Sequence, residues 1–327
     1  MKATLLALAL AATSLAAAAQ PAVSARALIS PVVSVVPAAG GQQLTTSDGV
    51  ALYVRVAGQG RPCLFVHGGP GAGSGAVEAL AGAALARQRL QLIYLDQRGS
   101  GRSGSPAGQD YSLARQVQDL EELREHLHLV RWVLLAHSFG GILATAYARQ
   151  HPDRVEALVL VNSILNLPAS MEATIPYGYG LLPAAPRPPL PGSAAPLPQR
   201  WGLVMGLLGQ HKLLGQLMYA HDSTGARISR AQRGVPANHD FATSVFQGRY
   251  PEYLADFTAA SASLRMPVLV ITGRQDYVTG PDHYRSFRFP RQRVVVVPGR
   301  HFALLENQAA LGTALRGFLR RLPRLAR

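Results

Sequence analysis

A serine placed between an apolar run of strand length and a stretch of helical composition is the feature that most constrains this chain. Ser138 follows the run 131–135 and precedes the segment 142–148. A sharp strand-to-helix turn that exposes a serine hydroxyl needs small residues two positions before and two positions after the serine. Ala136 and Gly140 occupy those positions, although glycine is more usual at the first of them. The segment therefore predicts either a nucleophilic serine or an ordinary strand–loop–helix junction.

Two further polar residues follow predicted strands in the order that such a serine needs. Asp276 comes after the apolar run 267–272, and His301 comes after the run 293–297. The carboxyl ends of parallel strands meet at one edge of an open α/β sheet, so we expect both residues to lie near Ser138. A serine hydroxyl becomes a good nucleophile when a base takes its proton and a third group orients that base. The order serine, acid, histidine predicts this triad, although Asp276 could instead cap the residues that follow it.

Three glycine-containing motifs point to a known family. They lie after the predicted strand 63–66, after the predicted strand 92–95 and around the serine, and they read His67-Gly68-Gly69-Pro70-Gly71, Asp96-Gln97-Arg98-Gly99-Ser100-Gly101-Arg102-Ser103 and His137-Ser138-Phe139-Gly140-Gly141. Together they resemble the proline iminopeptidase (prolyl aminopeptidase) family of serine peptidases. The resemblance covers about residues 45–322 and is weakest in the middle. It implies the α/β-hydrolase fold, a mostly parallel sheet with helices on both faces and an inserted cap domain.

The same resemblance implies a role for each residue of the site. Ser138 would be the nucleophile, His301 the base and Asp276 the acid that orients the base. The backbone amides of Gly69 and Phe139 would form the oxyanion hole, where a glycine-rich turn leaves an N–H unobstructed. Family members release an N-terminal proline from peptides, so we expect a small peptide or ester substrate and no cofactor.

Recognition of the free amine in such a substrate requires an acid in the cap. The cap region holds few carboxylates, namely Glu172, Asp222, Asp240, Glu252 and Asp256. Glu252 and Asp240 are the preferred substrate-binding candidates, because the aromatic residues Phe241, Tyr250 and Tyr253 flank them and could wall a proline-sized pocket. Each of these acids could also be a solvated surface charge.

Three alternative functions remain open from the sequence. A carboxylesterase would use the same triad with an apolar pocket that lacks a carboxylate. An NAD(P)-dependent oxidoreductase would use the G-x-G-x-x-A pattern of 71–76 with Asp96 on the ribose, but a predicted hairpin over 42–57 precedes that pattern, which normally opens on the first strand. A catalytically inactive binding protein is the third alternative, and its support is Ala136 in place of glycine.

The chain divides into three predicted parts after its N-terminal leader. We expect a mobile N-terminal segment over 20–41, an α/β-hydrolase core over 42–164 and 264–327, and a cap insertion over 165–263. Nine prolines between Pro168 and Pro198 predict that this part of the cap contains neither a regular helix nor a central strand.

The first residues have the pattern of a secretory signal. A charged start and an alanine- and leucine-rich run over 1–19 end in small residues suited to cleavage near Ala19. The run is short and alanine-rich for a membrane span, so we predict an exported, periplasmic or secreted protein without a stable membrane span.

The composition argues against a nucleic-acid partner, a disulfide and a bound metal ion. The net charge is +14, but almost all of the cations are arginines spread along the chain, which favours a solvated surface over a nucleic-acid site. Cys63 is the single cysteine, so no disulfide can form within the chain, and we see no metal-ligand pattern. The oligomeric state does not follow from the sequence.

Overall fold

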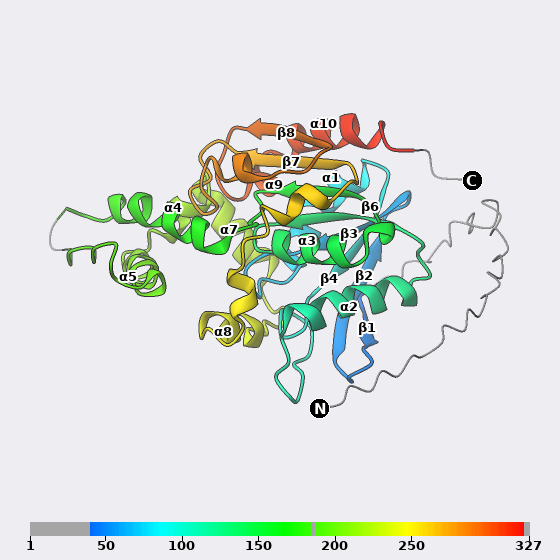
Figure 1. Ribbon diagram of the computed structural model, residues 1–327, viewed down its shortest axis with the longest axis horizontal. Coiled ribbons are helices and arrows are strands. Elements are labelled where there is room, and N and C mark those ends of the chain that lie inside the picture. The colour runs from blue at the N-terminus through cyan, green and yellow to red at the C-terminus, as the bar shows by residue number, and fades with distance from the viewer. Residues whose placement is uncertain (1–39, 185–186, 324–327) are drawn as a thin grey trace, which may run out of the picture. The chain divides into compact units, whose positions relative to one another are not determined.

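The computed structural model describes residues 40–184 and 187–323, and the predicted signal segment 1–19 and residues 20–39 of the predicted mobile segment lie outside them. The described chain builds one eight-stranded sheet (Figure 1). The bounds of its strands are β1 (Gln42–Thr45), β2 (Ala51–Ala57), β3 (Arg61–Val66), β4 (Leu90–Leu95), β5 (Trp132–His137), β6 (Val155–Val161), β7 (Val268–Gly273) and β8 (Gln292–Val297).

The strand order is β1-β2-β4-β3-β5-β6-β7-β8. β1 and β2 form the predicted antiparallel hairpin, and β2 pairs antiparallel with β4. All other neighbours run parallel. The loops that follow β3, β5, β6, β7 and β8 therefore emerge at one edge of the sheet, where the sequence places the motif and triad residues.

Helices cover both faces of the sheet because the central strands are apolar on both sides. In β5, Trp132 and Leu134 pack with one core cluster, whereas Val133 and Leu135 pack with the other. α2 (Leu113–His126) and α3 (Gly140–Gln150) cover the first face, and α1 (Gly75–Ala86), α9 (Ala303–Glu306) and α10 (Gln308–Leu319) cover the second. Among the helices described, none is long and apolar enough to cross a membrane.

The described part of the interval between β6 and β7 contains helices joined by loops and adds no strand to the sheet. Its helices are α4 (Leu167–Gly180), α5 (Leu197–Gln210), α6 (Leu214–Met218), α7 (Asp222–Ala231) and α8 (Asp240–Phe246). Of these, α4 and α5 project beyond the sheet in Figure 1. The main chain enters and leaves this region at one place, where the amide of Phe257 donates to the carbonyl of Leu165. We call the region the cap, and its boundaries at 165 and 263 stay predictions.

The prediction that the proline-rich part of the cap lacks a regular helix is wrong for α4. Pro168 lies in the first turn of this helix, where a backbone N–H has no partner within the helix, and Asn166 caps the turn by accepting from the amide of Ala169. Pro176 lies inside the helix, which continues past it to Gly180. Helix α4 forms one wall of the site described below.

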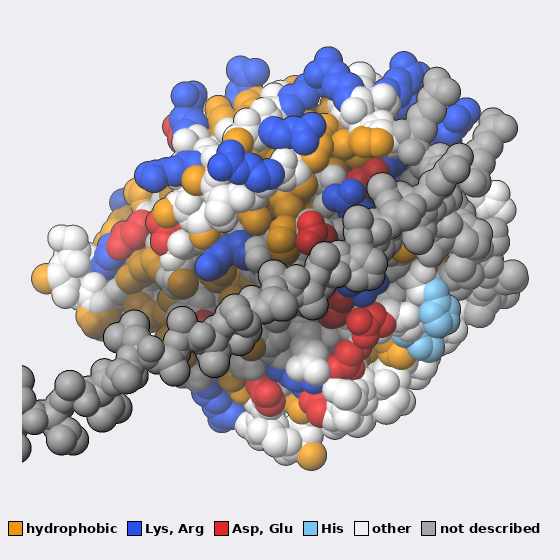
Figure 2. All heavy atoms as spheres, turned by 45° about the vertical axis from the view of Figure 1, so that its right-hand side comes forward, with side chains coloured by type: hydrophobic (Ala, Val, Ile, Leu, Met, Phe, Trp, Pro, Cys, Tyr) orange, Lys and Arg blue, Asp and Glu red, His pale blue; other side chains and the backbone are white. Residues whose placement is uncertain are grey.

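Positive charge gathers at the β8 edge of the sheet. Residues 264–323 hold ten arginines against three acidic residues. Arg293 is exposed on β8 itself, and Arg316 and Arg320 are exposed on or just after α10. Figure 2 shows Lys and Arg side chains gathered along the top of the molecule, where Figure 1 places β8 and α10.

Candidate active site

The turn between β5 and α3 holds Ser138 in a backbone conformation that few side chains adopt. The φ of Ser138 is +55°, in the left-handed region. A Cβ on Gly140 would collide with the carbonyl oxygen of Val66 on the neighbouring strand, so only glycine fits two residues after the serine. Ala136 is fully buried in the core, and its methyl group fits two residues before the serine. The sequence context therefore produces the sharp strand-to-helix turn that we predicted.

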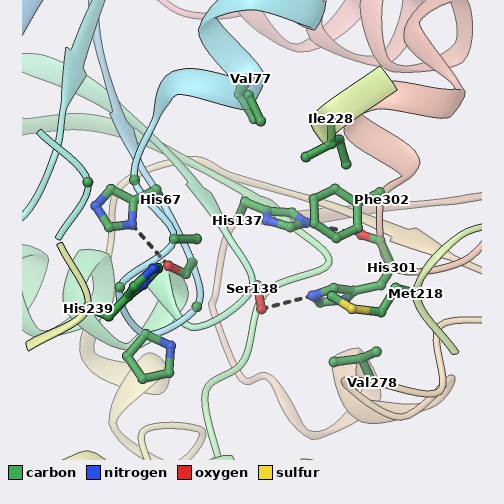
Figure 3. Close-up of a pocket in the computed structure, with 18 of the residues that line it drawn as sticks. His67, Val77, His137, Ser138, Met218, Ile228, His239, Val278, His301 and Phe302 are labelled. Carbon is green, nitrogen blue, oxygen red and sulfur yellow. Dashed lines mark hydrogen bonds between the residues drawn. The ribbon is translucent and has the colours of Figure 1, made fainter. Parts of the chain in front are cut away.

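The structure brings Ser138, His301 and Asp276 together from the ends of three strands. Oγ of Ser138 lies 2.9 Å from Nε2 of His301, and Figure 3 shows the hydroxyl directed at the His301 ring. On the other side of the ring, Nδ1 lies 3.1 Å and 3.2 Å from the two carboxylate oxygens of Asp276. The arrangement permits the serine hydroxyl to donate to Nε2 while Nδ1–H donates to the carboxylate.

Asp276 is fully buried, and hydrogen bonds keep its carboxylate ionised. Nδ2 of Asn162 and Oγ1 of Thr279 donate to Oδ2 at 2.6 Å and 2.7 Å, and the amides of Val278 and Thr279 both donate to Oδ1 at 3.1 Å. Burial alone would raise the pKa of Asp276, but His301 and the donors of Asn162 and Thr279 lower that pKa below its ordinary value. The carboxylate is thus held in the form that can accept from His301.

Two of the side chains that hold Asp276, those of Asn162 and Thr279, were not predicted from the sequence. Asn162 comes directly after β6 at the same sheet edge, and its position was the signal that could have identified it. Thr279 follows Asp276 by three residues, the spacing at which a threonine hydroxyl and amide can fold back onto an aspartate.

A second buried histidine supports the backbone of His301. Nε2 of His137 lies 3.0 Å from the carbonyl oxygen of His301, and because a carbonyl only accepts, this nitrogen carries the hydrogen. The two rings lie 4.9 Å apart. Burial, followed by the neighbouring charge of His301, lowers the pKa of His137 to about 3. His137 is therefore a neutral donor that fixes the loop after β8.

Two backbone amides in the loops around Ser138 have no hydrogen-bond partner among the described residues. Within the described chain, neither the amide of Gly69 nor that of Phe139 donates a hydrogen bond to any protein group. The loop after β3 also runs very close to the serine, since a Cβ on Gly68 would lie 2.6 Å from Cβ of Ser138. The ring of Phe139 packs against the rings of Phe241 and Tyr253, with ring centroids 6.0 Å and 5.3 Å apart. These two amides are the donors that we predicted for an oxyanion hole.

The loop after β4 holds the loop after β3 in place. The amide of Gln97 donates to Nε2 of His67 at 2.9 Å, so the hydrogen of this ring lies on Nδ1 and is donated to the carbonyl of Gly68 at 3.0 Å. The side-chain amide of Gln97 also donates to the carbonyl of His67 at 2.9 Å. The two motifs of the resemblance thus form one hydrogen-bonded unit beside Ser138.

A cavity of about 500 Å³ opens on Ser138 and His301. The core contributes the loops after β3, β4 and β5, and the cap contributes mainly apolar side chains (Figure 3). The cap lining includes Leu167, Met171, Trp201, Met205, Leu217, Met218, Ile228, Val235 and Phe246. The volume is in the ordinary range for a site that binds a small molecule.

Neither Glu252 nor Asp240 lies in this cavity as far as the structure describes its lining. The carboxylate of Glu252 accepts from the amide of Leu113 at 3.3 Å, at the start of α2. The carboxylate of Asp240 accepts from the hydroxyl of Ser105 at 2.6 Å at the surface. Two of their aromatic neighbours, Phe241 and Tyr253, pack against Phe139, but the two acids lie outside the cavity. The structure therefore does not bring our amine-binding candidates to the site.

Asp96 is the one carboxylate among the described residues that line the cavity, and it is fully engaged. Its oxygens accept from the amide and hydroxyl of Ser74, each at 2.6 Å, and from the amide and guanidinium of Arg102. Asp96 therefore has no free oxygen for the ribose of a nucleotide or for a substrate amine. Within the described chain, no group of three or more His, Cys, Asp or Glu side chains is placed to hold a metal ion.

The family described as alpha/beta hydrolase fold matches residues 61–308. The chain belongs to the α/β-hydrolase family. Its sheet, with helices on both faces and a helical region between β6 and β7, has the architecture that we predicted. Its similarity to individual members of the family differs between sequence and structure.

Curated relatives match the chain over a limited stretch. A proline iminopeptidase from Arabidopsis thaliana is 36% identical over 126 residues, which cover 36% of this chain and 31% of that protein. A proline iminopeptidase from Neisseria gonorrhoeae is 37% identical over 111 residues, which cover 34% of this chain and 35% of that protein. The chain thus spans about a third of the length of these relatives.

Solved structures match over most of the chain. A proline iminopeptidase-related protein from Thermus thermophilus has a TM-score of 0.69 at 23% identity and covers 86% of this chain and 98% of its own. An esterase from Exiguobacterium antarcticum has a TM-score of 0.62 at 19% identity and covers 86% of this chain and 99% of its own. At these identities the likeness shows the shared fold.

Proposed function

We propose that the protein is a serine hydrolase that cleaves acyl bonds through a covalent acyl-enzyme on Ser138. The observation that carries this proposal is the 2.9 Å separation of Oγ of Ser138 and Nε2 of His301, with the ionised carboxylate of Asp276 on the other side of the ring. A nucleophile, a base and an orienting acid within hydrogen-bond reach are what this chemistry requires.

The steps follow from the positions of these groups. Ser138 attacks the substrate carbonyl carbon while Nε2 of His301 takes the hydroxyl proton. The amides of Gly69 and Phe139 donate to the oxyanion that forms on the carbonyl oxygen. The intermediate collapses when His301 returns the proton to the leaving alcohol or amine, and water then attacks the acyl-enzyme with His301 again as the base. Asp276 keeps the ring in its tautomer and stabilises the imidazolium.

The lining of the cavity favours an ester with an uncharged, apolar acyl group as the substrate. The cap wall is mainly apolar, and Asp96, the one carboxylate described in the lining, is bound by Ser74 and Arg102. An ammonium group placed there would lose its water without gaining an ionic partner, which costs several kcal/mol. An apolar acyl chain would instead gain about 25 cal/mol for each Å² that it buries.

Release of an N-terminal proline is the second candidate function. It is favoured by the motif His67-Gly68-Gly69-Pro70-Gly71 and by the names of the curated relatives. This function requires a carboxylate near the bound amine, and a movement of the cap that carried Glu252 or Asp240 inward would have to supply it.

A panel of three substrates separates the two candidates. The p-nitrophenyl ester of a short fatty acid, proline β-naphthylamide and its N-acetylated form are offered to the wild type and to Ser138→Ala. We expect hydrolysis of the ester by the wild type alone. Cleavage of only the free-amine proline substrate would replace the esterase proposal with the aminopeptidase, and equal rates for Ser138→Ala would contradict the serine mechanism itself.

A further inference from the structure

The loop that carries Asp276 is fastened to the cap by hydroxyl groups of helix α4. Oγ1 of Thr174 lies 3.0 Å from the carbonyl oxygen of Tyr277 and 3.1 Å from that of Val278. Oγ of Ser170 donates to the carbonyl of Thr279 at 2.9 Å. Thr174 and Ser170 are both buried. Three consecutive carbonyls of the loop thus meet one face of a cap helix.

Two of these carbonyls belong to the peptide groups that hold Asp276. The carbonyl of Tyr277 shares its peptide plane with the amide of Val278, and the carbonyl of Val278 shares its plane with the amide of Thr279. Those two amides are the ones that donate to Oδ1 of Asp276, each at 3.1 Å. The hydroxyl of Thr174 therefore binds the far end of each peptide unit whose near end binds the carboxylate.

Within the described chain, Thr174 is the one donor that reaches either carbonyl. Its hydroxyl carries a single hydrogen and also lies 2.9 Å from the carbonyl of Ser170, so the hydrogen is shared among three acceptors. Loss of the hydroxyl would leave two loop carbonyls without a partner, and the peptide planes could then rotate to find one. Any such rotation turns the amides away from Asp276.

We propose that Thr174 is a positioning residue for the triad, which acts through the peptide groups 277–278 and 278–279 to fix the carboxylate of Asp276 against His301. This inference rests on the proposed hydrolase function. It makes the cap a structural part of the catalytic machinery, in addition to a wall of the substrate cavity.

The same contact links substrate binding to the orientation of the acid. Thr174 and Val278 both line the cavity, and Figure 3 shows Val278 on the cavity side of the loop. The rings of Tyr177 on α4 and Tyr277 on the loop stack at 3.6 Å with an angle of 7° between their planes. A bound acyl group that displaces α4 or Val278 would therefore also move the peptide groups whose amides donate to Asp276.

Thr174→Val tests the inference, because it removes the hydroxyl and keeps the shape of the side chain. Thr174→Ser keeps the hydroxyl and is the rescue variant. Thr145→Val on α3 is the matched control, since Thr145 is a buried helix threonine whose hydroxyl has no partner within the described chain. Each variant is measured for kcat and KM on the best ester, for the rate of labelling by a fluorophosphonate, and for the low-field proton resonance of Nδ1–H of His301.

We expect Thr174→Val to lower kcat and the labelling rate about tenfold with KM within twofold of the wild type. It should also shift the Nδ1–H resonance, whereas Thr174→Ser and Thr145→Val should match the wild type in all three measurements. An unchanged resonance and labelling rate in Thr174→Val would overturn the inference. Should this variant fail to fold, Thr174→Cys, whose thiol is a weak donor of similar size, takes its place.

Two further results separate this inference from related claims. Ser170→Ala removes a hydroxyl from the same helix to the same loop, but at a carbonyl whose peptide amide does not bind Asp276; a resonance shift as large as that of Thr174→Val would overturn the specific role of Thr174. A wild type that is neither labelled nor active would contradict the proposed function. The resonance would still report whether Thr174 orients Asp276 in that case.

Discussion

The two walls of the cavity are built on different principles. On the core wall, polar groups have defined partners, as in the bonds of Gln97 to His67, of Asn162 to Asp276 and of His137 to His301. The cap wall is lined mainly by flexible and apolar side chains such as Met205 and Met218. A rigid polar wall suits a fixed reaction, whereas an apolar wall rich in methionine accommodates different acyl groups. The difference indicates that the core supplies the reacting groups, whereas the cap determines the substrate and, through Thr174, helps to position Asp276.

The largest effect should follow from removal of the nucleophile in the core wall. Ser138→Ala should lower kcat by about 10⁴-fold or more, because only the oxyanion donors and substrate binding would remain. Ester hydrolysis at saturating substrate is the measurement. Ser163→Ala is the control: its hydroxyl donates to the carbonyl of Ala136 outside the cavity, and kcat should stay within about threefold. If kcat fell by a similar factor in both variants, the loss would reflect damage to the turn as a whole. It would then not identify Ser138 as the nucleophile.

A methyl group added to the core wall should be far more damaging than one added to the cap. Gly68→Ala would bring a Cβ within 2.6 Å of Cβ of Ser138, so we expect the rate of fluorophosphonate labelling to fall about 100-fold. Gly206→Ala on α5 meets no atom within 4 Å and should raise the unfolding free energy by roughly 0.5–1 kcal/mol through helix propensity, with labelling unchanged. Equal labelling rates in the two variants would contradict the rigidity of the core wall.

Shortening an apolar side chain of the cap should change the substrate preference and leave the chemistry intact. Met205→Ala should lower kcat/KM for a p-nitrophenyl octanoate about tenfold and leave that for the acetate within twofold. The ratio of the two specificity constants is the measurement. Met266→Ala, a buried methionine outside the cavity, should lower stability while the ratio stays at the wild-type value. If Met205→Ala lowered kcat/KM equally for the octanoate and the acetate, Met205 would affect the reaction itself and not the substrate preference.

The last prediction concerns the stability of the fold and its dependence on pH, not the activity. The pKa of His137 is lowered by burial to about 3 in the folded chain, against about 6.5 when unfolded. The unfolded chain therefore binds the extra proton between these values, so this histidine lowers the unfolding free energy by about 1.4 kcal/mol for each pH unit on acidification from about 6 to 4. The unfolding free energy, measured with denaturant at several pH values, should fall less steeply on acidification for His137→Gln than for the wild type. His211→Gln, at an exposed cap position, is the control and should give the wild-type slope of free energy against pH.

The same contrast explains which parts of the site could be predicted from the sequence. Ser138, Asp276 and His301 follow strands that the apolar runs identify, and parallel strands bring their ends to one edge without any knowledge of side-chain packing. The donors around Asp276 depend on packing between distant segments, as with Asn162, which lies 114 positions away in the chain. No periodicity predicts a contact of that kind.

The cap was harder to predict because its residues have no fixed motif. Glu252 was selected for its aromatic neighbours, but a neighbouring aromatic does not indicate which way a carboxylate faces, and Glu252 turns toward the start of α2. The number of prolines predicted no regular helix in this part of the cap, but α4 forms there because Pro168 lies in its first turn. Thr174 could have been found only after the helix and the Asp276 loop were seen together.

The arginines along the β8 edge affect how molecules of this protein meet one another. An edge strand offers unpaired backbone groups to any other strand, and a charged side chain such as Arg293 near the start of β8 discourages that pairing. The protection is electrostatic, so it weakens as salt shortens the range of repulsion to about 10 Å at 0.1 M and about 3 Å at 1 M. Concentrated solutions should therefore aggregate least at low ionic strength, where repulsion between the arginine-rich β8 edges keeps neighbouring molecules apart.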